Sequence, residues 1–146
     1  MSHTILVVDA PGGACFERVV STVKRASPAS FHVGTAEEVV RRVAAHDGPA
    51  VVIVTSDTPA PLAVAEQVYG AAPLTYVLFV ADDAGAATLA SGLRDSALAQ
   101  GARWAVSPPD DDRIVELLAG ALGASRRLKL KLPRTKDVFP WPFKAL

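Results

Sequence analysis

The sequence has a single cysteine, few aromatic residues and no long apolar run. Of its 146 residues, one is cysteine and 6% are aromatic. A lone cysteine excludes an internal disulfide bond, which fits a reducing compartment such as the cytoplasm. No stretch reaches the roughly 18 consecutive apolar residues of a membrane-spanning helix. The opening residues 1–9 (MSHTILVVD) lack the basic segment of a signal peptide. We therefore expect a cytoplasmic protein with no membrane partner.

Several motifs of catalytic and cofactor-binding proteins are also missing. Residues 11–17 (PGGACFE) have neither the Gly-Lys-Ser/Thr ending of a P-loop nor the spacing G-x-G-x-x-G. His3, His32 and His46 are scattered along the chain without the spacing of metal ligands. Cys15 falls within a helical pattern and is expected to be a core residue. These absences argue against an enzyme that uses a nucleotide or a zinc ion.

What the sequence does contain is a regular alternation of strand-like and helix-like segments. Half of the residues are hydrophobic. The expected strands are residues 4–9, 30–33, 50–56, 74–81 and 103–107, and the expected helices are residues 13–26, 35–46, 61–71, 85–101 and 109–125. Strict alternation implies parallel strands joined by right-handed crossovers, and continuous apolar strands imply a sheet covered on both faces.

Carboxylates follow two of the expected strands. Asp9 ends the first strand, and Asp57 ends the third in the segment VVIVTSDTPAP, residues 51–61. Ligands of an open parallel sheet bind outside the carboxyl ends of its strands. If the first and third strands are neighbours, the two carboxylates converge there. They could then hold Mg²⁺ or accept a phosphoryl group, or a strand-ending aspartate could simply be the N-cap of the next helix.

Residues 3–122 resemble the receiver domain of two-component response regulators. ILVVDA matches the family's first-strand motif ILVVDD, YVLFVAD is similar to its fourth strand, and GARWAVSPP is similar to its motif GAxxYxxKP. Asp57 and Pro61 keep the spacing between the phospho-accepting aspartate and the proline four residues later. The resemblance implies a flavodoxin-like, doubly wound, five-stranded parallel sheet in the order 2-1-3-4-5, with five flanking helices.

The resemblance places Asp57 at the phospho-acceptor position and assigns Asp9 and Asp57 to a Mg²⁺ site. Three of the family's functional groups are missing, however. Ala10 replaces the acid that contacts Mg²⁺, Ala81 replaces a hydroxyl residue, and Ser107 replaces a lysine. Each lost bond to a charged group is worth roughly 1.5–3 kcal/mol. We therefore expect inefficient Mg²⁺-dependent phosphorylation and no bound cofactor, with Mg²⁺ as the alternative.

The same resemblance identifies a switch and interface region around the fifth strand. Trp104 stands at the position of the switch aromatic, and Pro108 shapes the following turn, often through a cis bond in the family. Ala81 and Ser107 are the other two switch positions. Receiver domains commonly dimerise or dock through their fourth helix, fifth strand and fifth helix, so Trp104 would lie on an interaction face.

The charge distribution divides the chain into residues 1–125 and 126–146. The first part, the receiver-like domain, has a net charge of −6, and the second, a C-terminal tail, has +6. The tail could lie over the acidic body, bind a partner protein, or contact a nucleic acid or an anionic membrane. Contact with nucleic acid is the weakest of these, because aromatic residues separated by prolines make a poor stacking platform.

The tail contains two apolar patterns. In residues 127–132 leucines alternate with basic residues, which predicts a strand with one apolar face, and residues 138–146 combine aromatics with two prolines. The candidate partner-binding residues are Leu128, Leu130, Leu132, Phe139, Trp141 and Phe143. They could pack on their own domain, on a second subunit or on another protein.

Two hypotheses about function remain open. In the first, the protein is an atypical receiver-like signalling module that acts by protein–protein interaction, with another protein or with a second copy of itself as a homodimer, through the Trp104 face and the tail. In the second, it is a single-domain response regulator that accepts a phosphoryl group on Asp57.

Overall fold

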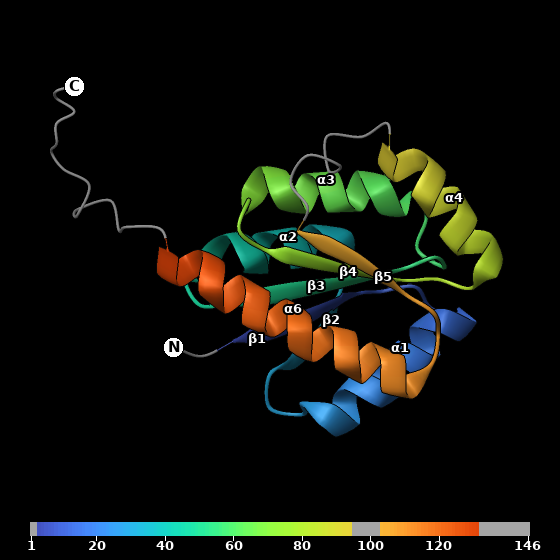
Figure 1. Cartoon of the computed structure of the whole chain (residues 1–146), viewed down its shortest axis with the longest axis horizontal. Coiled ribbons are helices and arrows are strands. Elements are labelled where there is room, and N and C mark those ends of the chain that lie inside the picture. The colour runs from blue at the N-terminus through green and yellow to red at the C-terminus, as the bar shows by residue number, and fades with distance from the viewer. Residues whose placement is uncertain (1–2, 95–102, 132–146) are drawn as a thin grey trace, which may run out of the picture.

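The structure, a computed structural model, describes residues 3–94 and 103–131, with residues 126–131 as backbone only. Its centre is a parallel sheet of five strands, β1 (Thr4–Val8), β2 (Phe31–Gly34), β3 (Ala50–Thr55), β4 (Tyr76–Val80) and β5 (Trp104–Ser107) (Figure 1). The strand order is β2-β1-β3-β4-β5, and every neighbouring pair is parallel. The predicted sheet and its order are confirmed.

Helices alternate with the strands along the described chain. They are α1 (Ala14–Ala26), α2 (Ala36–Ala45), α3 (Pro61–Ala71), α4 (Asp83–Arg94) and α6 (Asp111–Lys131). Figure 1 shows α1 and α6 on one face of the sheet and α2, α3 and α4 on the other. The coverage of both faces was expected from the alternation, and the whole is the flavodoxin-like arrangement that the resemblance implied. Within the described ranges, no helix is both long enough and apolar enough to cross a membrane.

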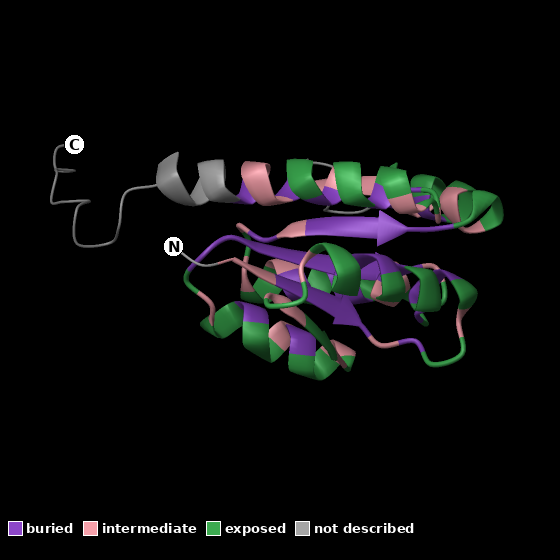
Figure 2. Ribbon diagram, turned by 90° about the horizontal axis from the view of Figure 1, so that it is seen from below, coloured by how far each residue is buried: buried purple, intermediate pink, exposed green. Residues whose placement is uncertain are grey.

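Two hydrophobic layers, one on each face of the sheet, hold the helices in place. Val51 and Ile53 pack into the layer under α1 and α6, whereas Val52 and Val54 pack into the layer under α2, α3 and α4. All four side chains are fully buried. Figure 2 shows the buried strands between helices whose outer surfaces are exposed. Burial on both faces explains why β3 is a continuous apolar run.

Local sequence signals set several element boundaries. Thr35 and Glu38 form the expected capping box of α2: the Glu38 N–H donates to Thr35 Oγ1 at 3.2 Å, and the Thr35 N–H donates to Glu38 Oε1 at 3.0 Å. Gly12 has a positive φ of 82°, which allows the chain to turn into α1. Cys15 is buried, as predicted.

The predicted strand at residues 127–132 is wrong for residues 127–131, because α6 continues through them to Lys131. Leucine, lysine and arginine are strong helix formers, and an established helix propagates at little cost. Leu128 and Leu130 are therefore helical residues. Leu132, Phe139, Trp141 and Phe143 lie outside the described residues, as does the end of the helix predicted at 85–101.

Candidate functional site

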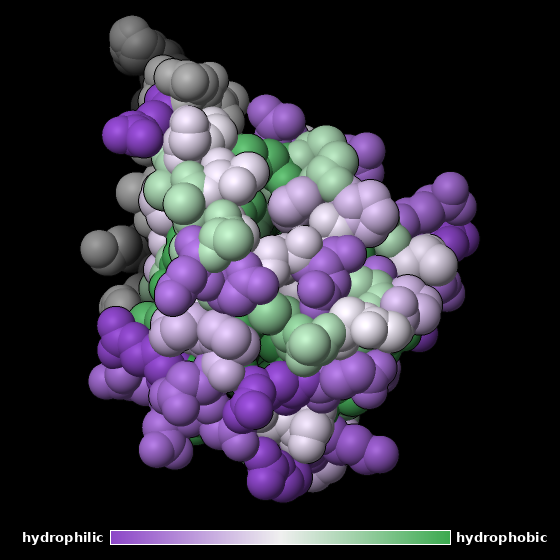
Figure 3. Space-filling model, turned by 90° about the vertical axis from the view of Figure 1, so that its right-hand side faces the viewer, coloured by the Kyte–Doolittle hydropathy of each residue, from purple (hydrophilic) through white to green (hydrophobic). Residues whose placement is uncertain are grey.

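Several of the residues singled out from the sequence lie at the carboxyl ends of the strands. Because β1 and β3 are adjacent, Asp9 and Asp57 follow neighbouring strands, as the spacing allowed. Ala81 directly follows β4, and Ser107 ends β5 next to it. In the view of Figure 3, which faces this edge, hydrophilic side chains surround a middle region that is less polar.

Asp57 caps a helix that is distant in the sequence. The backbone N–H of Phe16, in the first turn of α1, donates to Asp57 Oδ2 at 2.9 Å. The N-cap residue of α1 is Gly13, which offers no side-chain bond of its own. A Cβ at Gly13 would lie 2.5 Å from the Cβ of Asp57, so only glycine admits the carboxylate there. The positive end of the helix dipole stabilises a carboxylate in this position.

The two residues that follow β1 have different environments. Asp9 is half-buried, and its backbone N–H donates to the Gly34 carbonyl at 2.8 Å. Ala10 is buried in the hydrophobic layer beneath α1 and α6, and its carbonyl accepts the Gly13 N–H at 3.1 Å. In residues 3–94 and 103–131, no group of three or more histidine, cysteine or acidic side chains is placed to hold a metal ion.

Ala81 and Ser107 are also turned away from the edge. Ala81 is buried in the opposite hydrophobic layer, and its N–H donates to the Ser107 carbonyl at 3.0 Å. The Ser107 hydroxyl is fully buried and donates to the Pro108 carbonyl at 2.8 Å. The bond preceding Pro108 is trans, in contrast to the cis form common in receiver domains. Neither side chain presents a polar group to a ligand at Asp57.

Other acids at this edge serve as helix caps. The Gly85 N–H donates to Asp82 Oδ1 at 2.8 Å at the start of α4. The Arg113 N–H donates to Asp110 Oδ2 at 3.2 Å at the start of α6. Asp82, which follows β4, therefore caps the next helix, whereas Asp57 bonds to α1 instead and the next helix, α3, has no side-chain cap.

Asp111 joins α6 to α1 in a contact that the sequence did not reveal. Its carboxylate accepts a bond from the Thr22 hydroxyl at 2.8 Å and forms ion pairs with Arg18 and Arg25, each at 3.1 Å. The Thr22 bond, followed by the two arginines, lowers the pKa of Asp111 below its ordinary value. The four-residue and three-residue spacing of Arg18, Thr22 and Arg25 places them on one face of α1, which was the available signal.

An apolar pocket of about 350 Å³ lies between the starts of α3 and α4. Ser56, Pro61, Gly85 and Leu89 are among its lining residues. A Cβ at Gly85 would lie 2.7 Å from the Ser56 Cβ, so glycine keeps this space open. The Ser56 hydroxyl is 3.7 Å from Cys15 Sγ. Sequence patterns alone did not point to this pocket.

Trp104 lies at the edge of the sheet, beside a second apolar pocket. This pocket has a volume of about 360 Å³ and is lined by Trp104 and Val106 of β5 with Ala90, Leu93 and Arg94 of α4. Trp104 is half-buried against the hydrophobic layer on this face. We call this lining the Trp104 surface.

The start of β5 is anchored by two tyrosines. Tyr76 donates its hydroxyl to the Trp104 carbonyl at 3.2 Å, and Tyr69 donates to the Arg103 carbonyl. The Arg103 guanidinium also lies 5.8 Å from the centre of the Tyr69 ring. Burial raises the pKa of Tyr69. These contacts fix the backbone that carries Trp104.

Comparison of the chain with protein-family models, with curated proteins and with solved structures finds no match in any of the three.

Proposed function

We propose that this protein is an atypical receiver-like signalling module that acts by docking onto another protein or a second copy of itself. It is a binding protein, not an enzyme, and the usual Mg²⁺-dependent phosphorylation is inefficient. The observation that carries the proposal is the bond from the Phe16 N–H to Asp57. The carboxylate at the phospho-acceptor position stabilises the start of α1, and this role explains why an acid is present there without phosphoryl chemistry.

The surroundings of Asp57 support the same conclusion. A phosphoryl group carries about two negative charges and needs several charged or polar partners. Ala10 and Ala81 are buried apolar residues, and the Ser107 hydroxyl donates to a backbone carbonyl. A phosphoryl group on Asp57 would also break the cap of α1.

The docking part of the proposal rests on the Trp104 surface. Trp104 belongs to β5, the last strand in the sheet order, and is only half-buried, and aromatic residues are common anchors of protein interfaces. The pocket beside Trp104 is mainly apolar and suits an aromatic or aliphatic anchor. The tail residues Phe139, Trp141 and Phe143 would add to this binding.

The alternative is a phospho-accepting response regulator that uses Asp57. In its favour, Asp57 is exposed and follows the strand adjacent to that of Asp9. The hydroxyls of Thr55 and Thr58 are buried and lack a hydrogen-bond partner within the described residues. They offer two further polar atoms close to Asp57 in the sequence.

Intact mass spectrometry after incubation with Mg²⁺ and acetyl phosphate separates the two functions. Docking without phosphorylation predicts an unchanged mass for the full chain. An added phosphoryl group that disappears in Asp57→Asn would establish the alternative.

A further inference from the structure

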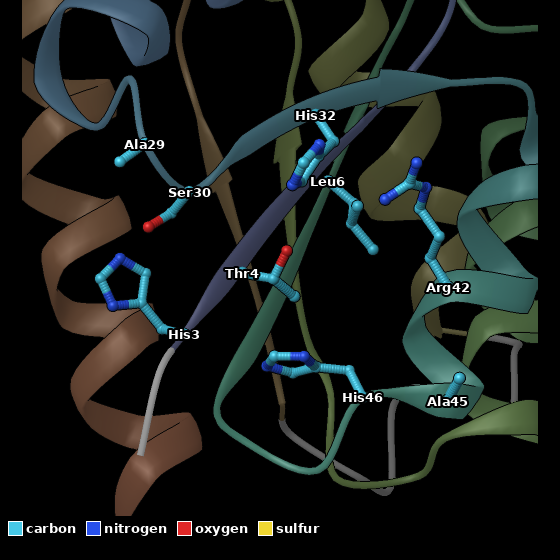
Figure 4. A pocket seen from close by; sticks show the side chains of 9 residues that line it. All are labelled: His3, Thr4, Leu6, Ala29, Ser30, His32, Arg42, Ala45 and His46. Atoms are coloured by element: carbon cyan, nitrogen blue, oxygen red, sulfur yellow. The ribbon is translucent and has the colours of Figure 1, made fainter.

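The three histidines of the chain, far apart in the sequence, line a single pocket. His3 precedes β1, His32 lies on β2, and His46 follows α2; Arg42, in the last turn of α2, joins them. The pocket has a volume of about 440 Å³ and lies at the amino end of β1, away from Asp57. In Figure 4 the labelled side chains surround β1, with His3 and Ser30 on one side of it and Arg42 and His46 on the other.

The fold assembles this pocket through strand pairing and helix placement. Leu6 is the register partner of His32, which puts both side chains on the same face of the sheet. Leu6 belongs to the hydrophobic layer that Val39 and Val43 of α2 cover. The C-terminal end of α2 therefore reaches the region beside His32 and supplies Arg42 and His46. Its negative dipole end favours positive charge there.

The pocket lining provides hydrogen-bond donors but no carboxylate. Arg42 and the three histidines are joined by the hydroxyls of Thr4 and Ser30. Two acids close in sequence to Arg42 and His46 are not part of the lining: the Glu38 carboxylate belongs to the capping box with Thr35, and Asp47 is exposed after His46. Arg42 also attracts the Glu38 carboxylate one turn earlier on α2, but it is the one fixed positive charge of the lining, where it can attract an anion.

One polar atom of the pocket lacks a partner. His46 Nε2 is buried and makes no hydrogen bond within the part of the chain that the structure describes. Leaving a buried polar atom unpaired is costly, so such an atom in a pocket is satisfied by water or by a ligand. A metal shared by the histidines does not fit, because no three potential ligands among the described residues are placed to hold one.

We propose that this pocket binds the phosphate group of a small molecule. Arg42 supplies the fixed positive charge and a planar set of donors that matches phosphate oxygens. His46 supplies a ring nitrogen, and the other histidines and the two hydroxyls complete the polar lining. A volume of about 440 Å³ is within the range of small-molecule sites and exceeds the need of inorganic phosphate alone. The site is independent of Asp57 and of the Trp104 surface.

Titration of the untagged full chain tests the proposal. The chain has only three histidines, so the imidazole region of its NMR spectrum contains few signals, and each signal is assigned by substitution. Inorganic phosphate and glycerol phosphate are the two probes, and sodium chloride at the same ionic strength is the control. We expect saturable shifts of the His46 signals with both probes, and tighter binding of glycerol phosphate than of inorganic phosphate because the pocket has room for more than a phosphate group.

Arg42→Gln and Arg41→Gln provide a matched pair of variants. Both remove one positive charge from an exposed position of α2, but only Arg42 lines the pocket. We expect Arg42→Gln to weaken phosphate binding about tenfold or more and Arg41→Gln to change it less than twofold. Circular dichroism confirms that each variant is folded. Equal effects of the two substitutions, or shifts that never saturate, would overturn the proposal.

Discussion

The carboxylate of Asp57 accepts the backbone N–H of Phe16 across 41 residues of sequence, at a distance of 2.9 Å. This bond joins the end of β3 to the first turn of α1. Gly13, the N-cap of α1, leaves the space that the carboxylate occupies. Asp57 therefore stabilises a helix that is distant from it in the sequence.

Replacing Asp57 tests this capping role. We expect Asp57→Ala to lower the free energy of unfolding by about 1 kcal/mol, the usual cost of a lost cap, and Asp57→Asn to cost less because its amide oxygen still accepts. Urea denaturation measures both. Asp47→Ala is the control, since Asp47 is an exposed acid for which the described structure has no hydrogen bond. Equal stability of Asp57→Ala and Asp47→Ala would contradict the capping role.

Gly13→Ala should destabilise the protein. The added Cβ would overlap the Asp57 side chain, and relieving that overlap costs about 1–3 kcal/mol. Gly120→Ala is the matched control: Gly120 is an exposed glycine of α6 with open space at its Cβ position, so alanine there should stabilise by about 0.5–1 kcal/mol.

A double-mutant cycle identifies the cause of the Gly13 effect. If the Asp57 side chain is the obstacle, Gly13→Ala should cost clearly less in an Asp57→Ala background than in the wild-type chain. Urea unfolding of the four proteins gives the coupling energy. Additive effects would mean that the strain at Gly13 arises elsewhere.

Asp111 makes the contact between α6 and α1 dependent on pH. The Thr22 hydroxyl, then Arg25 and Arg18, lower its pKa below the ordinary 3.8. A carboxylate with a lowered folded-state pKa contributes stability above its unfolded pKa, and this contribution is lost as the pH falls through the folded value. The wild type should therefore be more stable than Asp111→Asn at pH 7, and the difference should shrink below about pH 4.

Asp112→Asn is the control for this measurement. Asp112 occupies the same first turn of α6 but is exposed and forms no bond to α1 in the described structure. Both substitutions remove a charge from the same helix end, so the comparison isolates the Thr22 and arginine contacts. A pH dependence shared by the two variants would assign the effect to the helix dipole instead.

Removing residues 132–146 tests whether the tail joins two copies of the chain. A chain that ends at Lys131 keeps all of the described residues of α6 and loses Phe139, Trp141 and Phe143. With a second copy as the partner, the full chain sediments as a dimer and the shortened chain as a monomer. A monomer in both cases would exclude the tail as a dimerisation device and leave another protein as the partner.

The sequence predicted what depends on local patterns and missed what depends on distant contacts. The apolar runs gave the strands, and Thr35 with Glu38 gave the start of α2, because neighbouring residues determine both. The alternation of leucine and lysine after Arg127 led to the wrong prediction of a strand, because the same residues are good helix formers. The bond between Phe16 and Asp57 and the pocket shared by the three histidines join residues that are far apart in the sequence. They depend on the assembled sheet, so local patterns did not reveal them.

The most direct test of the central claim is the response of Trp104 to Mg²⁺ and beryllofluoride, a mimic of the phosphoryl group. Trp141→Phe leaves Trp104 as the only tryptophan, so its fluorescence can be followed alone. Our account predicts no saturable change, because Asp57 lacks the partners that would hold the mimic. A saturable change that Asp57→Asn abolishes would contradict it and establish Asp57 as a working phospho-acceptor.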